Sequence, residues 1–333
     1  MNMNVKKVAI VRLSALGDIV NSAVVTQFIK KAYPSVSLEW ITEEVFAPLL
    51  LCDANIDKVH TINLKKIKKE RNFSLLKENV QKLKNLGEFD IIIDMQGLIK
   101  SAIVSRLIGK QVHGFDKNST RESLAALFYK TTSTISYESG VVNRNCFLVS
   151  DALNFTISDE MLLAKQAIFQ KHHNFEKSTQ KKSVAFVIGA SWNSKIYPKE
   201  HIVKVCDALQ EDAFIIWGNE TEKAEAEWIA KHTLHAIVAP QMNLEELVSF
   251  ISSMDLVIGN DTGPTHLAWA QNIPSITLFG PTTTRMIYDT KQNIGIKSPS
   301  KVDIYKIDKN DYSIREIAPK IIIHHAKELL NGL

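Results

Sequence analysis

The sequence predicts an α/β protein made of two doubly wound parallel-sheet domains in tandem. The chain has 333 residues, which is above the size at which a single hydrophobic core usually keeps growing. Short apolar runs alternate with longer amphipathic segments, the pattern of parallel strands covered by helices. This alternation stops at a polar stretch, residues 172–182, and then starts again. Two domains follow from these three observations.

The first series of elements occupies the N-terminal half. Apolar runs of strand length are expected at residues 5–13, 37–42, 58–64, 90–95 and 111–115. Amphipathic patterns with helical spacing lie between them, near residues 19–31, 74–86 and 99–108. Strands that alternate with helices in this way indicate a parallel sheet.

The second series repeats the pattern after the polar stretch. Strands are expected at residues 183–188, 213–217, 236–238, 256–259 and 275–279, and helices near 200–209, 221–231, 244–251 and 265–270. We therefore predict domains at 1–172 and 183–312. Residues 313–333 have an amphipathic helical pattern with an internal Pro319, and this helix either closes the second domain or packs back on the first.

Composition excludes several protein classes. With 45% hydrophobic and 23% charged residues the chain has an ordinary globular composition. No apolar run reaches the roughly 18 residues of a membrane span, so a soluble, cytoplasmic protein is expected. Cys52, Cys146 and Cys206 lie far apart without metal-ligand spacing, which predicts buried thiols and no zinc site.

The formal net charge of +4 is too small to indicate nucleic-acid binding, but it is unevenly distributed. Residues 1–150 carry 21 Lys/Arg against 14 Asp/Glu, whereas residues 151–333 carry 19 against 22. The densest basic stretch contains Lys65, Lys66, Lys68, Lys69 and Arg71. This stretch is either a solvated loop face or a docking surface for an anionic partner.

The loop after the first predicted strand contains Asp18. The sequence SALGDIV, residues 14–20, has neither the GxGxxG dinucleotide fingerprint nor a P-loop pattern. Asp18 stands at the start of a helix, below the carboxyl end of the strand, where ligands of such sheets bind. It is therefore either an N-cap of that helix or a functional carboxylate.

The second domain has a loop suited to an anion. In GNDTGPTH, residues 259–266, a strand ends at a turn of small residues and a helix begins, which leaves free N–H groups at a positive dipole end. Asp261 and Thr262 can cap this helix, and a phosphate beside His266 is the functional alternative. The turn at residues 279–282 would line the same opening.

Two further loops carry candidates of the same kind. Lys195 follows the first strand of the second domain and can supply a point charge to a phosphate, or it is a solvated lysine. Glu222 follows the next strand, where an acidic residue commonly binds ribose hydroxyls, or it is a surface residue favoured by the helix dipole.

Taken in order, the motifs resemble the bacterial lipopolysaccharide heptosyltransferase I family. They are SALGDIV, DMQGLIKS at residues 94–101, HGFD with TRESLA at 113–125, KIYPKEH at 195–201, and GNDTGPTHLAWA with LFGPT at 259–282. The resemblance extends over essentially the whole chain.

The resemblance implies a GT-B glycosyltransferase, with two Rossmann-like domains facing a central cleft, the acceptor on the first and the donor on the second. The implied reaction is the transfer of L-glycero-D-manno-heptose from ADP-heptose to the inner Kdo of Kdo-lipid A, with inversion and without metal or cofactor. It further implies a peripheral location on the anionic cytoplasmic face of the inner membrane, and no nucleic-acid partner. The alternatives are a heptosyltransferase II that adds the second heptose, and a non-catalytic nucleotide-sugar-binding protein.

Roles carry over from the resemblance residue by residue. Asp18 matches the catalytic base and Lys195 the diphosphate-binding lysine. Glu222 and Met242 match the ribose and adenine positions. The donor phosphate and sugar loop corresponds to Asp261, Thr262, Gly263 and His266.

The implied acceptor residues are Gln96 in DMQGLIKS, Arg121 in TRESLA, and the basic stretch Lys65, Lys66, Lys68, Lys69 and Arg71. Two departures from the family pattern stand out. Ala190 and Ser191 occupy the donor positions where the pattern has two hydroxyl residues, so one diphosphate contact is lost or replaced. The basic stretch uses lysines where the pattern is rich in arginine, which does not favour bidentate phosphate contacts.

Overall fold

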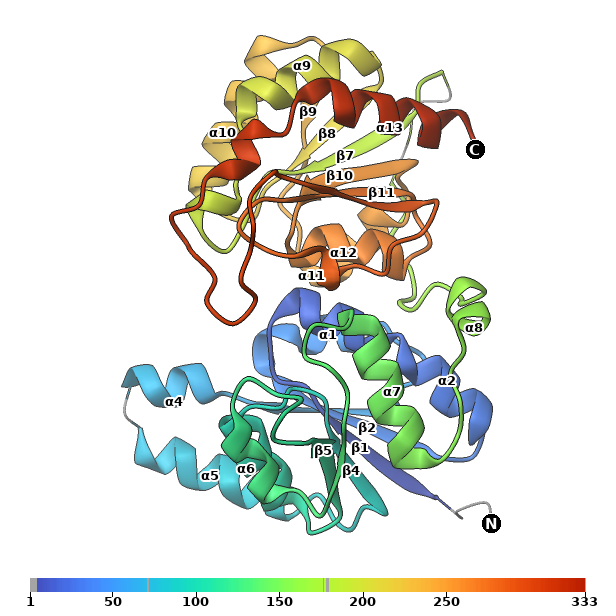
Figure 1. Cartoon of the computed structure of the whole chain (residues 1–333), viewed down its shortest axis with the longest axis vertical. Helices are drawn as coiled ribbons and strands as arrows, with labels where there is room; N and C mark the ends of the chain where they lie inside the picture. The colour runs from blue at the N-terminus through green and yellow to red at the C-terminus, as the bar shows by residue number, and fades with distance from the viewer. Residues whose placement is uncertain (1–4, 71, 176, 178–179, 333) are drawn as a thin grey trace. The chain divides into compact units, whose positions relative to one another are not determined.

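The computed structural model describes every residue except 1–4, 71, 176, 178–179 and 333. The chain divides into two compact units, Met1–Phe169 and Gln170–Leu333. The division falls a few residues before the polar stretch in which the sequence places the linker. Each unit is an open, fully parallel six-stranded sheet with helices on both faces (Figure 1).

In the first unit the strand order is β3-β2-β1-β4-β5-β6. The strands are β1 (Lys7–Val11), β2 (Ser37–Glu43), β3 (Lys58–Ile62), β4 (Ile91–Asp94), β5 (Val112–Phe115) and β6 (Thr131–Ser133). Central strands are apolar on both faces because helices cover both sides, so Val8 to Val11 of β1 are fully buried.

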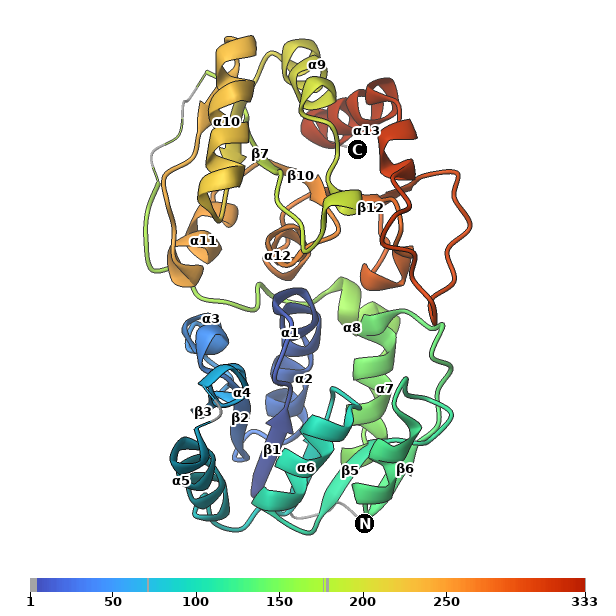
Figure 2. The same ribbon diagram turned by 90° about the vertical axis from the view of Figure 1, so that its left-hand side faces the viewer.

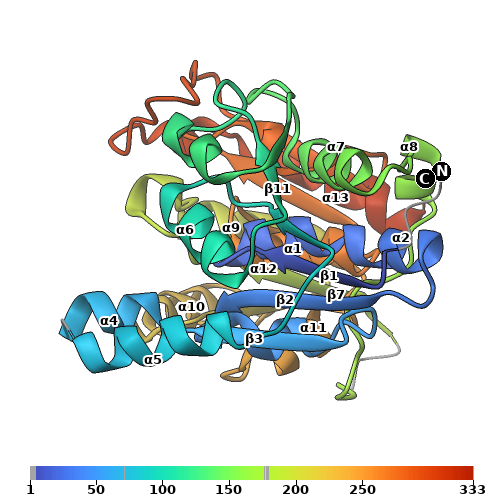
Figure 3. The same ribbon diagram turned by 90° about the horizontal axis from the view of Figure 1, so that it is seen from below.

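The helices of the first unit form two layers. They are α1 (Leu16–Ala23), α2 (Val25–Ala32), α3 (Ala47–Leu50), α4 (Leu64–Glu70), α5 (Phe73–Lys84), α6 (Ile99–Ile108), α7 (Val141–Leu153) and α8 (Asp159–Leu163), with 3-10 turns η1 (Glu44–Phe46) and η2 (Ser123–Phe128). Figure 1 shows α1, α2 and α7 on one face of the sheet and α5 and α6 on the other. Figures 2 and 3 show α4 and α5 as neighbours near the β3 edge.

The second unit repeats this topology, with the order β12-β11-β10-β7-β8-β9. Its strands are β7 (Ser183–Val187), β8 (Asp212–Ile216), β9 (Ala236–Val238), β10 (Leu256–Asn260), β11 (Ser275–Phe279) and β12 (Asn293–Lys297). Its helices are α9 (Lys199–Leu209), α10 (Glu220–His232), α11 (Leu244–Ile251), α12 (Gly263–Ala270) and α13 (Pro319–Asn331), with 3-10 turns η3 (Asn193–Lys195), η4 (Thr284–Met286) and η5 (Ser313–Glu316).

The C-terminal helix α13 belongs to the second unit. It packs against α9, and Ile322, Ala326 and Leu329 enter the same core as β7, β10 and β11. Pro319 is not internal to the helix, as the sequence pattern suggested, but is its first residue, where the missing N–H costs nothing.

Candidate functional site

Both sheets have the strand order 3-2-1-4-5-6, which fixes where a ligand can bind. In this order the connections run in opposite directions from the first and fourth strands, so a crevice opens at their carboxyl ends. These strands are β1 and β4 in the first unit, and β7 and β10 in the second. Asp18 and Gln96 follow β1 and β4, and Lys195 and Asp261 follow β7 and β10. The topology therefore places these four candidates in the two loop pairs where function is expected.

Asp18 is the third residue of α1, and Ala15 occupies the N-cap position. The prediction that Asp18 could be the N-cap residue is therefore wrong. Asp18 Oδ2 accepts a 3.3 Å hydrogen bond from the Ala15 N–H. Asp18 Oδ1 lies 2.8 Å from Nη2 of Arg12. The Asp18 side chain stays 31% exposed, whereas that of Arg12 is 10% exposed. Asp18 is thus an accessible carboxylate with a buried cationic partner.

Gln96 joins the β1 and β4 loops of the first unit. Its Oε1 accepts a 2.9 Å hydrogen bond from the Leu13 N–H. The backbone around it is held by the buried Asp94, which accepts hydrogen bonds from the N–H groups of Gln96 and Gly97. Asp94 Oδ2 also accepts from Ser101 Oγ at 2.9 Å and from Tyr129 Oη at 2.8 Å. Burial raises the pKa of the Asp94 carboxyl despite these donors.

In the second unit, Asp261 is the centre of a buried polar cluster. Its Oδ2 lies 2.7 Å from Lys195 Nζ and accepts a 2.8 Å hydrogen bond from Thr282 Oγ1. Its Oδ1 lies 3.0 Å from His266 Nε2. Burial alone would raise the pKa of Asp261, but the hydrogen bond with His266 and the charge of Lys195 outweigh it and hold that pKa well below its usual range. Asp261 is therefore the anion that fixes Lys195 and His266 in place.

This cluster corrects one expectation for the α12 loop. Thr262 does occupy the N-cap position, but its side chain makes no capping hydrogen bond, and the Asp261 carboxylate is directed to Lys195, His266 and Thr282 instead. The N-terminus of α12, which begins at Gly263, thus has no side-chain cap from these residues. A helix N-terminus in this state favours a bound anion.

Asn260, which the sequence reasoning did not single out, holds the neighbouring loop. Its amide donates to the carbonyl of Ile188 at 2.8 Å, and its Oδ1 accepts from the Tyr197 N–H at 3.1 Å. Thr265 Oγ1 donates to the Asn260 carbonyl at 2.7 Å. The signal available in the sequence was an amide residue at the end of an apolar run, followed by small and hydroxyl residues.

Glu222 lies where the loops after β7 and β8 meet. It is the third residue of α10, and its Oε2 accepts a 2.7 Å hydrogen bond from the Gly218 N–H. A β-carbon on Gly189 would lie 2.5 Å from Glu222 Oε1, so only glycine allows this approach. Both expected roles, ribose partner and dipole-favoured residue, fit this position.

The remaining donor candidates flank this group. Ala190 is half-buried and Ser191 exposed in the loop after β7, and Met242 is half-buried between β9 and α11. Lys195 Nζ and Lys309 Nζ lie 4.9 and 5.2 Å from the centroid of the Trp192 ring. The sequence did not point to Lys309, a lysine in a long polar segment.

The basic stretch is helical and not a loop. Lys65, Lys66 and Lys69 lie on α4 and are exposed. Lys68 is also on α4, but its side chain is not described, and Arg71 lies outside the described residues. Arg121 is exposed shortly before η2.

The N-terminus of α4 meets the carboxyl end of β2, the strand next to β1. Glu43, the last residue of β2, is buried, which raises its pKa, while the N–H group of Lys65 and the charge of Lys100 act in the opposite direction. Lys100 Nζ donates to Ser14 Oγ, in the Asp18 loop, at 3.3 Å. Sequence reasoning missed Lys100, although it stands in DMQGLIKS.

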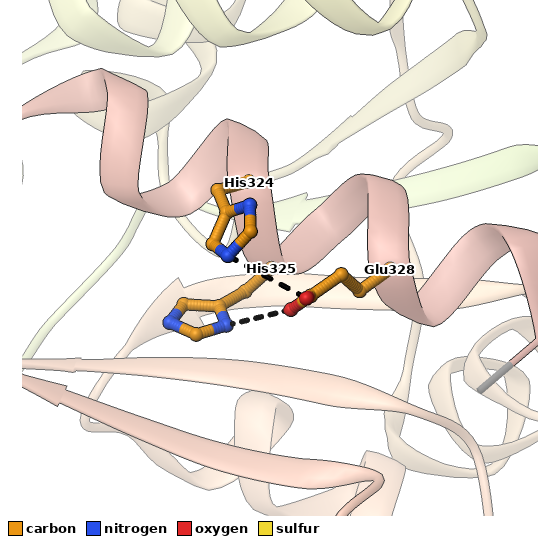
Figure 4. Close-up of side chains that lie close together, drawn as sticks. All are labelled: His324, His325 and Glu328. Carbon is orange, nitrogen blue, oxygen red and sulfur yellow. Dashed lines mark hydrogen bonds and ion pairs between the residues drawn. The ribbon is translucent and has the colours of Figure 1, made fainter.

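One group of side chains in the described part of the chain is close enough to hold a metal ion: His324, His325 and Glu328 (Figure 4). Glu328 lies 3.5 Å from His324 Nε2 and 3.2 Å from His325 Nδ1. All three are on the surface of α13 at helical spacings of three and four residues, which brings such side chains together without an ion. Among the described residues, no helix has the length and apolar character needed to cross a membrane.

Sequence comparisons with known proteins identify relatives of this chain. The model of glycosyltransferase family 9 (heptosyltransferase) matches residues 78–311. Lipopolysaccharide heptosyltransferase 1 of Campylobacter coli is 38% identical over 97% of this chain and 98% of its own length. The enzyme of the same name from Escherichia coli K12 is 27% identical over 84% of this chain and 90% of its own length.

Solved structures support the fold. The E. coli heptosyltransferase WaaC with ADP-2-deoxy-2-fluoro heptose has a TM-score of 0.79 at 23% identity and covers 98% of this chain and 100% of its own. A family 9 glycosyltransferase from Veillonella parvula has the same TM-score of 0.79 at 17% identity, with 99% of each chain covered. At these identities the likeness establishes the fold, which is GT-B-like. The sequence comparisons go further, and the chain belongs to glycosyltransferase family 9, the heptosyltransferases.

Proposed function

We propose that the protein is an inverting, metal-independent transferase that moves L-glycero-D-manno-heptose from ADP-heptose to the inner Kdo of Kdo-lipid A. The observation that carries the proposal is the 38% identity, over nearly the full length of both chains, to a lipopolysaccharide heptosyltransferase 1. The loops after β1, β4, β7 and β10 supply groups suited to this chemistry.

We assign the donor to the second unit, because that unit holds a cationic side chain in a fixed position. Lys195 is buried and held by Asp261, so its ammonium group is positioned before the ligand arrives. The N-terminus of α12 adds its positive dipole end and the Gly263 N–H, since Pro264 has no N–H and that of Thr265 donates to the Thr262 carbonyl at 3.1 Å. The diphosphate of ADP-heptose fits these groups, and Glu222 and Met242 are the partners proposed for its ribose and adenine.

The chemical step requires one base and a stabilised leaving group. The acceptor hydroxyl oxygen forms a bond to the anomeric carbon from the face opposite the diphosphate, while Asp18 takes the hydroxyl proton. The bond from the anomeric carbon to the phosphate oxygen breaks, and its electron pair leaves with ADP. Lys195, His266 and the N-terminus of α12 stabilise the charge that develops on that oxygen. Attack opposite the leaving group inverts the anomeric configuration.

The acceptor is assigned to the first unit, because that unit contains Asp18 and the basic helix α4. Lys65, Lys66 and Lys69 are exposed, as phosphate groups of a lipid acceptor and an anionic membrane surface require. Gln96 and Arg121 complete the proposed acceptor contacts. The protein would then work as a peripheral protein on the cytoplasmic face of the inner membrane.

An acceptor comparison tests this function. The protein is incubated with ADP-heptose and either Kdo-lipid A or the same lipid already carrying one heptose, and the lipid mass and ADP release are measured. We expect one added heptose on Kdo-lipid A only. Transfer only to the heptosylated lipid would assign the second-heptose reaction, and ADP-heptose binding without ADP release would make the protein a nucleotide-sugar-binding protein.

A further inference from the structure

Arg12 lies between the two loops that meet at the switch point of the first unit. It follows β1, and its backbone N–H continues the ladder to the Ile41 carbonyl at 3.2 Å. Its Nη1 donates to the carbonyl of Met95 in the β4 loop, and its Nη2 pairs with Asp18 Oδ1 at 2.8 Å. One planar guanidinium thus connects the β4 loop to the first turn of α1.

Arg12 is held from several sides. The residue is 8% exposed, and its own carbonyl accepts a 3.2 Å hydrogen bond from the indole of the fully buried Trp40. A buried guanidinium without a counter-ion is strongly destabilising, so Arg12 favours a carboxylate beside it. Two rigid donors on one group fix direction as well as distance.

The two oxygens of Asp18 therefore differ. Oδ1 is engaged by the charged Arg12, whereas Oδ2 has a longer bond of 3.3 Å from the neutral Ala15 N–H. Oδ2 is the oxygen that can exchange its weaker donor for an incoming hydroxyl. A base held in one orientation loses less freedom when the acceptor binds.

We propose that Arg12 is a positioning residue: it holds Asp18 Oδ1 so that Oδ2 faces the acceptor hydroxyl and receives its proton. The proposal rests on the role of Asp18 as the base. Arg12 itself touches neither substrate nor reacting atoms.

Other charged groups lie around this loop and are left in place by the test. Lys100 of α6 bonds Ser14, and Glu43 ends the neighbouring strand β2. On α7, which packs against α1, Arg144 bonds the carbonyls of Ile135, Ser136 and Ser119, and Asp151 accepts from Ser133. Arg12 is the cation in salt-bridge contact with Asp18.

The test compares Arg12→Met and Arg12→Lys with wild type, Asp18→Asn, and the control Arg106→Met, which removes an exposed arginine from α6 of the same unit. The kcat, the acceptor KM and the ADP affinity of each variant are measured. For Arg12→Met we expect kcat to fall about 10- to 100-fold. Loss of a residue that orients a metal ligand lowers activity by a similar factor, and Arg12 orients Asp18 in a comparable way. The acceptor KM should change far less than kcat, because Arg12 holds the base and does not bind the acceptor. ADP affinity should not change.

Arg12→Lys keeps the charge but has one ammonium for two acceptors, so we expect a kcat between those of wild type and Arg12→Met, with an unchanged acceptor KM. If Arg12→Met does not fold, the kcat of Arg12→Lys tests the role of Arg12 instead. A wild-type kcat in Arg12→Lys, or a folded Arg12→Met whose acceptor KM changes as much as its kcat, overturns the role of Arg12 while Asp18 remains the base. Retained turnover in Asp18→Asn instead overturns the proposed base, and the role of Arg12 with it.

Discussion

Lys195 Nζ and Asp261 Oδ2 lie 2.7 Å apart, and both residues are less than one tenth exposed. The pair joins the loop after β7 to the loop after β10, the two strands that flank the switch point of the second unit. Because Asp261 also holds His266 and Thr282, the position of the lysine depends on a network and not on a single contact.

Lys195→Ala should weaken ADP and ADP-heptose alike, by about 1.5–3 kcal/mol, the range for a hydrogen bond to a charged group. Calorimetric titration with ADP measures this. Lys199→Ala, which removes a more exposed lysine from the start of α9, is the control and should bind ADP normally. Equal ADP affinity in the two variants would leave Lys195 a structural partner of Asp261.

The buried carboxylate of Asp261 predicts an acid-sensitive second unit. Its pKa is lower in the folded chain than in the unfolded chain, so the folded state binds fewer protons and gains stability above the unfolded pKa of about 3.9. That contribution is lost as the pH falls through the folded pKa. Urea unfolding between pH 2 and pH 6 should therefore show a steeper loss of stability below about pH 4 in wild type than in Asp261→Asn. Parallel curves would contradict the ion-paired state.

Asp18→Ala should lower turnover by about 10² to 10⁴, the usual range for a lost general base. ADP-heptose affinity should remain nearly normal, because the donor groups lie in the second unit. Steady-state kinetics and titration separate the two effects. Near-normal turnover would reduce Asp18 to a residue that stabilises the first turn of α1.

Glu222→Gln should weaken ADP binding, since a neutral amide accepts hydrogen bonds from ribose less strongly than a carboxylate. Glu220→Gln is the matched control, in the same first turn of α10 but 84% exposed in its side chain. Gly189→Ala should act like Glu222→Gln, because its β-carbon would displace the carboxylate. If all three variants bind ADP as wild type does, Glu222 only stabilises the start of α10 and does not bind the ribose.

Reversal of Lys65, Lys66 and Lys69 to Glu should raise the acceptor KM and weaken binding to anionic vesicles, with ADP affinity unchanged. Exposed charges are screened beyond about 8 Å at physiological salt, so the difference from wild type should shrink as salt rises. Reversal of three exposed lysines of the second unit, Lys231, Lys320 and Lys327, is the control. An unchanged acceptor KM at low salt would leave α4 a solvated surface.

Much of the fold is readable in the sequence because buried parallel strands are continuous apolar runs, as in β1 and β10. Two strands, β6 and β12, were not predicted because they are not continuous apolar runs. Strand β6 is the polar triplet TTS at a sheet edge, and β12 contains Gly295. Helix α7 was missed because Arg144 and Asn145 are buried in it, which breaks the expected amphipathic pattern.

The site was predictable where chemistry follows a strand end, as at Asp18 and Lys195. The partners that hold these side chains were not predictable. Arg12 appears in the sequence as a charge that interrupts a strand, and only the fold shows that it pairs with Asp18. The basic stretch was expected as a loop because its lysines obscure Leu64 and Ile67, although lysine is a good helix former.

A crystal structure with an unreactive ADP-heptose analogue and Kdo-lipid A tests the central claim most directly. We expect the diphosphate on Lys195 and the N-terminus of α12, with Asp18 Oδ2 within about 6 Å of the anomeric carbon, one hydrogen bond plus one attack distance, on the face opposite the diphosphate. An anomeric carbon that faces a different base, with Asp18 remote from the acceptor hydroxyl, would contradict it.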